Sequence, residues 1–144
     1  MPLLKMTKDS IDIGIVVKDL AVAEKFYGDT LGLPVVREVE LNADKVAQSG
    51  CASGPFRFKA FQAGDVQLKI VQADADPPSG TGKVDAATGH RYITFSVESV
   101  EESYSALKSA GVPLQGEITE VAPGRFICFF ADPDGNMLEC VGPK

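Results

Sequence analysis

Glu139 is a carboxylate in a place where carboxylates are costly. It stands in the middle of the apolar run 137–141, which has the length of a strand and follows the turn-forming segment PDGN at 133–136. A charged side chain on a half-buried strand is strongly unfavourable unless another group pairs with it. A carboxylate held in this way can move a proton to or from a bound ligand. Glu139 is therefore the first candidate for a functional residue.

Other polar residues fall on one face of several predicted strands. Side chains alternate along a strand, so each predicted strand has an apolar face, which must pack under a helix, and a second face of mixed composition. The mixed faces are predicted to line a cleft. The residues placed in this cleft beside Glu139 are Asp12, Gln67, Lys69, Tyr92, Thr94, Ser96 and Met137.

The elements that position these residues occur twice. A β-branched run at 11–17 precedes a helix capped by Asp19, and a similar run at 92–97 precedes a helix capped by Ser99. The two runs align at one constant spacing, which indicates an internal repeat. The other predicted strands are residues 35–41, 55–61, 66–72 and two runs around the turn within 125–141.

The repeat predicts an α+β fold in which each half has the order βαβββ. We expect one domain over residues 1–144, with module one at 11–72, a linker at 73–90 and module two at 91–141. The linker is rich in Pro, Gly, Ala and Asp and lacks apolar periodicity. Residues 42–54 are also expected to form a loop, and both loops are predicted to shape the mouth of the cleft.

Composition and charge exclude several kinds of partner. The chain has 144 residues, a net charge of −6 and a pI near 4.7, which argues against nucleic acid or an anionic membrane as the main partner. No apolar run approaches the ~20 residues of a membrane span, and the N-terminal residues lack the apolar segment of a signal peptide. We therefore expect a cytoplasmic protein whose cysteines, Cys51, Cys128 and Cys140, are reduced and buried.

Three segments of the chain carry a family resemblance. They are IDIGIVVKDLAVAEKFYGDTLGLPV, YITFSVESVEESYSALKSAGVPL and FFADPDGNMLECV. Together they resemble the vicinal oxygen chelate superfamily, which includes glyoxalase I, bleomycin-resistance proteins and extradiol dioxygenases. The resemblance implies that the two βαβββ modules form an open, eight-stranded, U-shaped barrel around a central cavity, and that two chains assemble as a homodimer.

In metal-dependent members of this superfamily, each module gives one ligand from its first strand and one from its last. The resemblance places these ligands at Asp12, Gln67, Tyr92 and Glu139. Glu139 matches the usual residue and Gln67 matches the variant of methylmalonyl-CoA epimerases, whereas Asp12 and Tyr92 stand where the family usually has histidine. The alternatives are a divalent cation (Mg, Mn, Ni or Zn) on these oxygen donors, or no cofactor, with Lys69 supplying the positive charge instead.

The histidine count removes one class of chemistry. The chain contains a single histidine, His90, so a site of two histidines and a carboxylate cannot form within one chain, which excludes an extradiol-type dioxygenase. His90 precedes a predicted strand and is interpreted as a solvated loop residue, with a general base as the alternative. Arg125 is interpreted as a surface residue, with a substrate carboxylate as its alternative partner.

Two functions follow from the resemblance. In the first, a glyoxalase- or bleomycin-resistance-like protein binds a small molecule in the cleft without a metal, and the loss of both first-strand histidines favours it. In the second, the protein is a metal-dependent lyase or isomerase of the lactoylglutathione lyase or methylmalonyl-CoA epimerase type, with Glu139 and Tyr92 as catalytic residues. The ligand-binding residues are Asp12, Gln67, Lys69, Thr94, Ser96 and Met137.

Overall fold

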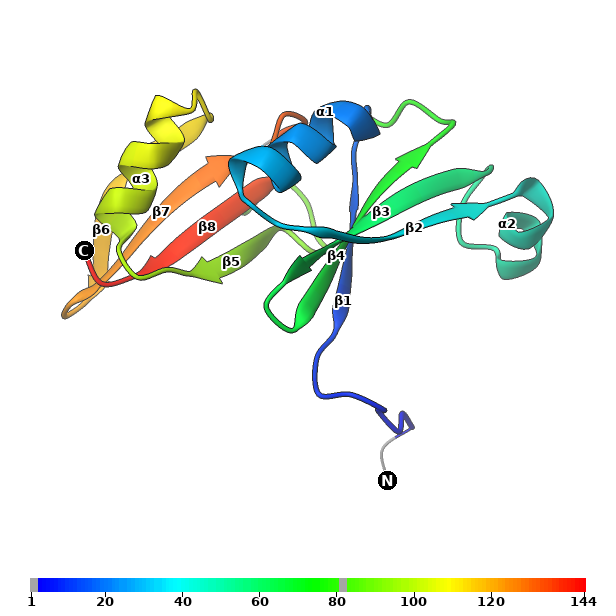
Figure 1. The fold of residues 1–144 in the computed structure, drawn as a ribbon, viewed down its shortest axis with the longest axis horizontal. Coiled ribbons are helices and arrows are strands. Elements are labelled where there is room, and N and C mark those ends of the chain that lie inside the picture. Colours follow the sequence, from blue (N-terminus) through cyan, green and yellow to red (C-terminus); the bar gives the residue numbers. More distant parts are fainter. Residues whose placement is uncertain (1–2, 81–82) are drawn as a thin grey trace. The chain divides into compact units, whose positions relative to one another are not determined.

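Each half of the chain folds as a strand, a helix and three further strands, and the first half has one more short helix between its second and third strands (Figure 1). The computed structural model describes residues 3–80 and 83–144, and it divides into two units, Met1–Pro77 and Pro78–Lys144. The elements of the first unit are β1 (Asp12–Val16), α1 (Leu20–Glu24), η1 (Lys25–Thr30), β2 (Val35–Leu41), α2 (Ala43–Ser49), β3 (Phe56–Ala63) and β4 (Val66–Ala73). Those of the second unit are β5 (Tyr92–Ser96), α3 (Val100–Ser109), β6 (Leu114–Ala122), β7 (Arg125–Ala131) and β8 (Met137–Gly142).

Both units have the same sheet topology. The strand order is β1-β4-β3-β2 in the first sheet and β5-β8-β7-β6 in the second. The first strand of each unit pairs in parallel with the last, and all other pairs are antiparallel. The predicted α+β class and the βαβββ order of each module are confirmed.

The first helix changes its winding part of the way along. Asp19 caps α1 by accepting hydrogen bonds from the backbone N–H groups of Ala21 and Val22, as its sequence position predicts. The chain then widens into the π-helix η1, which ends with Leu31 donating to the carbonyl of Phe26. The wider turn explains why Leu31 is only half-buried, although an α-helix would have placed it on the buried face.

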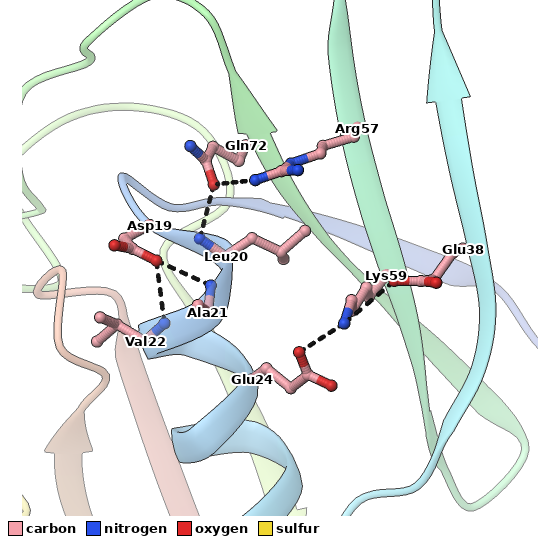
Figure 2. Close-up of polar contacts among 9 residues, drawn as sticks. All are labelled: Asp19, Leu20, Ala21, Val22, Glu24, Glu38, Arg57, Lys59 and Gln72. Carbon is pink, nitrogen blue, oxygen red and sulfur yellow. Dashed lines mark hydrogen bonds and ion pairs between the residues drawn. The ribbon is translucent and has the colours of Figure 1, made fainter.

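Polar contacts hold α1 against its sheet (Figure 2). The backbone N–H of Leu20 donates to Oε1 of Gln72 at 2.8 Å, so a strand side chain satisfies one free donor of the helix N-terminus. Lys59 on β3 donates to Glu24 of the helix at 2.5 Å and lies 3.1 Å from Glu38 of β2. The hydrogen bond with Glu24, and then that with Glu38, raises the pKa of Lys59 above its ordinary value.

The prediction that residues 42–54 form a loop is wrong for the first part of that segment, because Ala43–Ser49 is the helix α2. Asn42 caps it by accepting from the N–H of Lys45, and Gly50 ends it in the left-handed conformation, with φ 71°. Val46 is the one buried residue of this short helix. One buried residue gives no apolar periodicity from which a helix could be predicted, although Asn42 and Gly50 are typical capping residues.

The apolar faces of the strands form the cores. In the first unit, Leu68 and Ile70 are fully buried together with Phe61 and Tyr27, whose rings lie 6.1 Å apart. In the second unit, α3 packs on β6, β7 and β8. Cys128 and Cys140 are buried, as predicted, and they are register partners between β7 and β8. Cys51 is exposed, contrary to prediction, because it follows the end of α2.

The turn between β7 and β8 is organised by Asp132, whose side chain is buried. Its carboxylate accepts hydrogen bonds from the backbone N–H groups of Asp134 and Asn136 and from the amide of Asn136. Gly80 of the predicted linker donates its N–H to the carbonyl of Asp134 at 2.8 Å. A Cβ on Gly80 would lie 2.5 Å from the carbonyl oxygen of Gly135, so the close approach requires glycine at position 80.

Among the described residues, no helix has both the length and the apolar character needed to cross a membrane.

Replacing Asp132 by alanine is expected to destabilise the protein by about 2 kcal/mol, because it leaves partly buried N–H donors of Asp134 and Asn136 without an acceptor. Urea unfolding followed by circular dichroism measures the effect. Asp65→Ala, in the exposed β3–β4 turn, is the matched control and is expected to change stability little. Equal effects of the two substitutions would contradict this account of the turn.

Candidate functional site

The polar face of the first sheet, opposite α1, carries four predicted or neighbouring site residues in two adjacent pairs. Asp12 of β1 is the register partner of Gln67 on β4, and Gly14 is the partner of Lys69. Because partners in adjacent strands point to the same face, these four positions form one patch. We call this patch, with the side chains that reach it, the cationic cluster.

Asp12 is the acidic member of the cluster. Its Oδ1 lies 2.7 Å from Nζ of Lys8 and its Oδ2 lies 3.9 Å from Nζ of Lys69. The hydrogen bond from Lys8 lowers the pKa of Asp12 below its ordinary value, and partial burial opposes this. The charges of Lys8, Lys69 and Arg37 lower the pKa further, so Asp12 is ionised at neutral pH.

Arg37 of β2 joins the cluster from two strands away. Its Nη2 donates to Oε1 of Gln67 at 3.1 Å, so the side chain reaches across β3 to β4. Its guanidinium carbon and Nζ of Lys69 each lie 5.7 Å from the centre of the Phe58 ring, within the range of a cation–π contact. Two cations from different strands are thus held against one buried ring.

Glu139 on the second sheet is in a different environment. Only 8% of it is exposed, and no hydrogen bond or ion pair to its carboxylate is present among residues 3–80 and 83–144. Its register partners are Thr94 on β5 and Phe129 on β7. Burial raises the pKa of Glu139 above its ordinary value, and the charge of Arg125 opposes this weakly. A carboxyl group in this state suits proton transfer.

The other predicted residues of the second sheet surround Glu139 unevenly. Tyr92 is 46% exposed and packs edge-on against Phe129, with ring centres 5.7 Å apart. Thr94 and Ser96 are exposed, whereas Met137 is buried. These positions match the predicted faces, and the binding and catalytic roles of their side chains stay predictions.

The register corrects one assignment made from the sequence. Tyr92 is paired with Met137, and Thr94 is paired with Glu139. In the first unit, the same two positions are Asp12 with Gln67, and Gly14 with Lys69. The structural counterpart of Glu139 is therefore Lys69 and not Gln67. A cation stands in the first unit where the second has a carboxylate.

Sequence reasoning missed Lys8, Arg37 and Gly14 as members of the cationic cluster. Lys8 lies before β1, where no periodicity places a side chain. A register shift between Val35 and Arg37 hides the face of Arg37 from simple alternation. His90 is exposed in the segment before β5, as interpreted, and Arg125 is exposed at the start of β7.

The charge pattern of the cationic cluster does not fit a divalent metal ion in the first unit. Both predicted ligands there, Asp12 and Gln67, already accept hydrogen bonds from cationic side chains. A metal would have to displace Lys8 and Arg37 and remain close to Lys69, at an electrostatic cost. Among the described residues, no group of three or more His, Cys, Asp or Glu side chains has the geometry to hold a metal.

A charged hollow of the first unit has a structural role. A cavity of about 380 Å³ lies between α1 and strands β2 and β3. Its charged lining includes Lys59, which forms ion pairs with the two carboxylates of Glu24 and Glu38. We therefore place the candidate site on the polar sheet faces and not in this cavity.

Comparison with known proteins gives a consistent family. The model of the Glyoxalase/Bleomycin resistance protein/Dioxygenase superfamily matches residues 10–140. Glyoxalase 1 of Caenorhabditis elegans is 25% identical over 97% of this chain, which spans only 43% of that protein. The uncharacterized protein YaeR of Escherichia coli is 27% identical, over 88% of this chain and 90% of its own length.

A solved structure agrees with the fold. A glyoxalase family protein from Bacillus cereus superposes with a TM-score of 0.77 at 19% identity, covering 98% of this chain and 97% of its own.

Glu139→Gln is expected to make the protein more stable than wild type at pH 7. Because burial raises the pKa of Glu139, the folded state holds the proton more tightly than the unfolded state. The stability that wild type gains from this tighter proton binding is complete below the ordinary pKa of 4.5, and it is lost as the pH rises through the raised pKa of the folded state. The advantage of the variant therefore narrows as the pH falls.

Thermal unfolding between pH 4 and 8 measures this difference. Glu117→Gln, on an exposed position of β6, is the matched control and is expected to follow wild type at every pH. A Glu139→Gln protein that is less stable than wild type at pH 7 would show that the carboxylate has a favourable partner.

Proposed function

The chain belongs to the Glyoxalase/Bleomycin resistance protein/Dioxygenase superfamily, and on that premise we propose that it binds a small molecule without a resident metal ion. The residues proposed to contact the ligand are on the polar faces of the two sheets. In the first unit they are the cationic cluster, and in the second they are Tyr92, Thr94, Ser96, Met137 and Glu139. A homodimer and a cytoplasmic location belong to the same proposal, and the homodimer rests on the family resemblance.

The observation that supports the metal-free function is the position of Lys69. It stands on β4 where Glu139 stands on β8, so the first unit presents an ammonium group at the place of the acid. Nζ of Lys69 lies 3.9 Å from Asp12, which is too long for a direct hydrogen bond but close enough for electrostatic attraction. This ammonium places a positive charge where a metal ion would otherwise supply one, while Lys8 makes the direct ion pair with Asp12.

One observation favours the alternative, a metal-dependent lyase or isomerase. Glu139 is buried, has no partner among the described residues, and has a raised pKa, as expected of a group that shuttles a proton. The nematode relative is named Glyoxalase 1, although this chain spans less than half of its length. In this alternative, a divalent ion on oxygen donors would stabilise negative charge that develops on the substrate.

Elemental analysis of protein purified without chelators tests the metal-free proposal. We expect no stoichiometric Mg, Mn, Ni or Zn, before or after dialysis against each ion, because the cationic cluster disfavours a further positive charge. Asp12→Ala and Glu139→Ala proteins serve for comparison. A stoichiometric ion in wild type that is lost in either variant would contradict the proposal and support the metal-dependent alternative.

The enzyme alternative has its own measurement. Formation of lactoylglutathione from the methylglyoxal–glutathione hemithioacetal is followed by absorbance with each of the four ions added. We expect no activity above background. Activity that requires an added ion and is lost in Glu139→Gln would establish the lyase function, since that substitution keeps the shape of the side chain and removes its proton transfer.

A further inference from the structure

We propose that the ligand carries an oxyanion, a carboxylate, phosphate or phosphonate group, which binds to Lys69 and Arg37 beside Phe58 on the first sheet. This inference rests on the proposed function, because it names the class of small molecule that the polar face would take. Three features of that position support it: the balance of charge, free hydrogen-bond donors and open space.

The cationic cluster has more positive than negative charge. Lys8, Arg37 and Lys69 meet a single carboxylate, that of Asp12. Lys8 donates to Asp12 directly at 2.7 Å, and this close pair largely cancels. Arg37 donates to the neutral amide of Gln67, and Lys69 lies 3.9 Å from Asp12. The cluster as a whole therefore keeps an excess of positive charge at Arg37 and Lys69, which an anion would neutralise.

Both cations keep donors for a ligand. A guanidinium has five N–H donors and an ammonium has three. Arg37 uses one of its donors on Gln67, and Lys69 makes no direct hydrogen bond among the described residues. Because Oε1 of Gln67 accepts from Arg37, the amide nitrogen of Gln67 faces away from that bond with two further donors. An oxyanion is the group that matches these free donors of Arg37, Lys69 and Gln67.

Contacts with the Phe58 ring orient the two cations. Each lies 5.7 Å from the centre of the Phe58 ring, and Phe58 itself is buried. Arg37 crosses β3 above the buried residue Ala60, which is the register partner of both Arg37 and Lys69. Holding flexible side chains in place before the ligand arrives lowers the entropy that binding must overcome.

Gly14 provides space next to Lys69. It is the β1 partner of Lys69, and a Cβ built on it would meet no atom within 4 Å. Its φ is not positive, so the backbone does not require glycine there. A larger residue at this position would enter the open space without disturbing the fold.

Isothermal titration at low ionic strength tests the inference with phenylphosphonate and benzoate as probes, and with uncharged benzamide for comparison. We expect at least one of the two anions to bind and benzamide to bind at least about tenfold more weakly. The anion that binds more tightly identifies the oxyanion class. Benzamide binding as tightly as the anions would overturn the proposal, as would no binding of either anion.

Variants assign the binding to the cluster. Lys69→Met and Arg37→Gln are each expected to weaken anion binding about tenfold. Lys45→Met removes the same charge from the exposed face of α2 and is expected to leave binding unchanged. Gly14→Val is expected to block the probes while thermal unfolding shows a folded protein. Equal weakening by Lys45→Met and Lys69→Met would overturn the assignment.

Asp12→Asn separates this inference from the metal question. It removes the one carboxylate of the cluster, so anion binding is expected to tighten about threefold, whereas a metal site would lose its ion. Weaker anion binding in Asp12→Asn would overturn the inference. Failure of both anions to bind, in protein that elemental analysis shows to be metal-free, would remove the oxyanion inference and leave the proposed function standing.

Discussion

The parallel pairing of the first and last strands in each unit is the constraint on which the candidate site depends. This pairing decides which side chains of β1 and β4, or of β5 and β8, stand next to each other on one face. A slip by one residue would send Lys69 or Glu139 into the core under the helix. Leu68 and Leu138 precede Lys69 and Glu139 and are buried on the opposite face of their sheets. A slip would take these leucines out of the core, so their burial keeps the polar residues on the polar face.

The same register lets one scaffold carry opposite charges. The two sheets have equivalent topology, yet the position after the buried leucine is a lysine in the first and a glutamate in the second. The lysine is partly exposed and surrounded by other charges, whereas the glutamate is buried beside Thr94 and Phe129. A repeat therefore preserves the backbone and the apolar face, while the polar face is free to diverge.

Sequence reasoning predicted what periodicity and capping encode. The strands that were given residue ranges, the caps Asp19 and Ser99 and the division of faces agree with the structure, because each depends on neighbours in the chain. Strand β6 (Leu114–Ala122) was not located from the sequence. Helix α2 was missed because one buried valine makes no pattern. Local sequence does not specify the register between strands, which makes Lys69 the structural equivalent of Glu139. Nor does it specify the register shift in β2 that precedes Arg37, whose side chain reaches Gln67. The predicted convergence of Asp12, Gln67, Tyr92 and Glu139 stays a prediction.

Gly14 has a consequence for how this protein can evolve. Most positions beside a binding surface also support the fold, so changing them trades recognition against stability. Gly14 lies in an ordinary extended backbone with empty space in front of it, and a β-branched residue there would even favour the strand. If this face binds a ligand as proposed, substitution at this single position would narrow the range of accepted molecules without a compensatory change elsewhere.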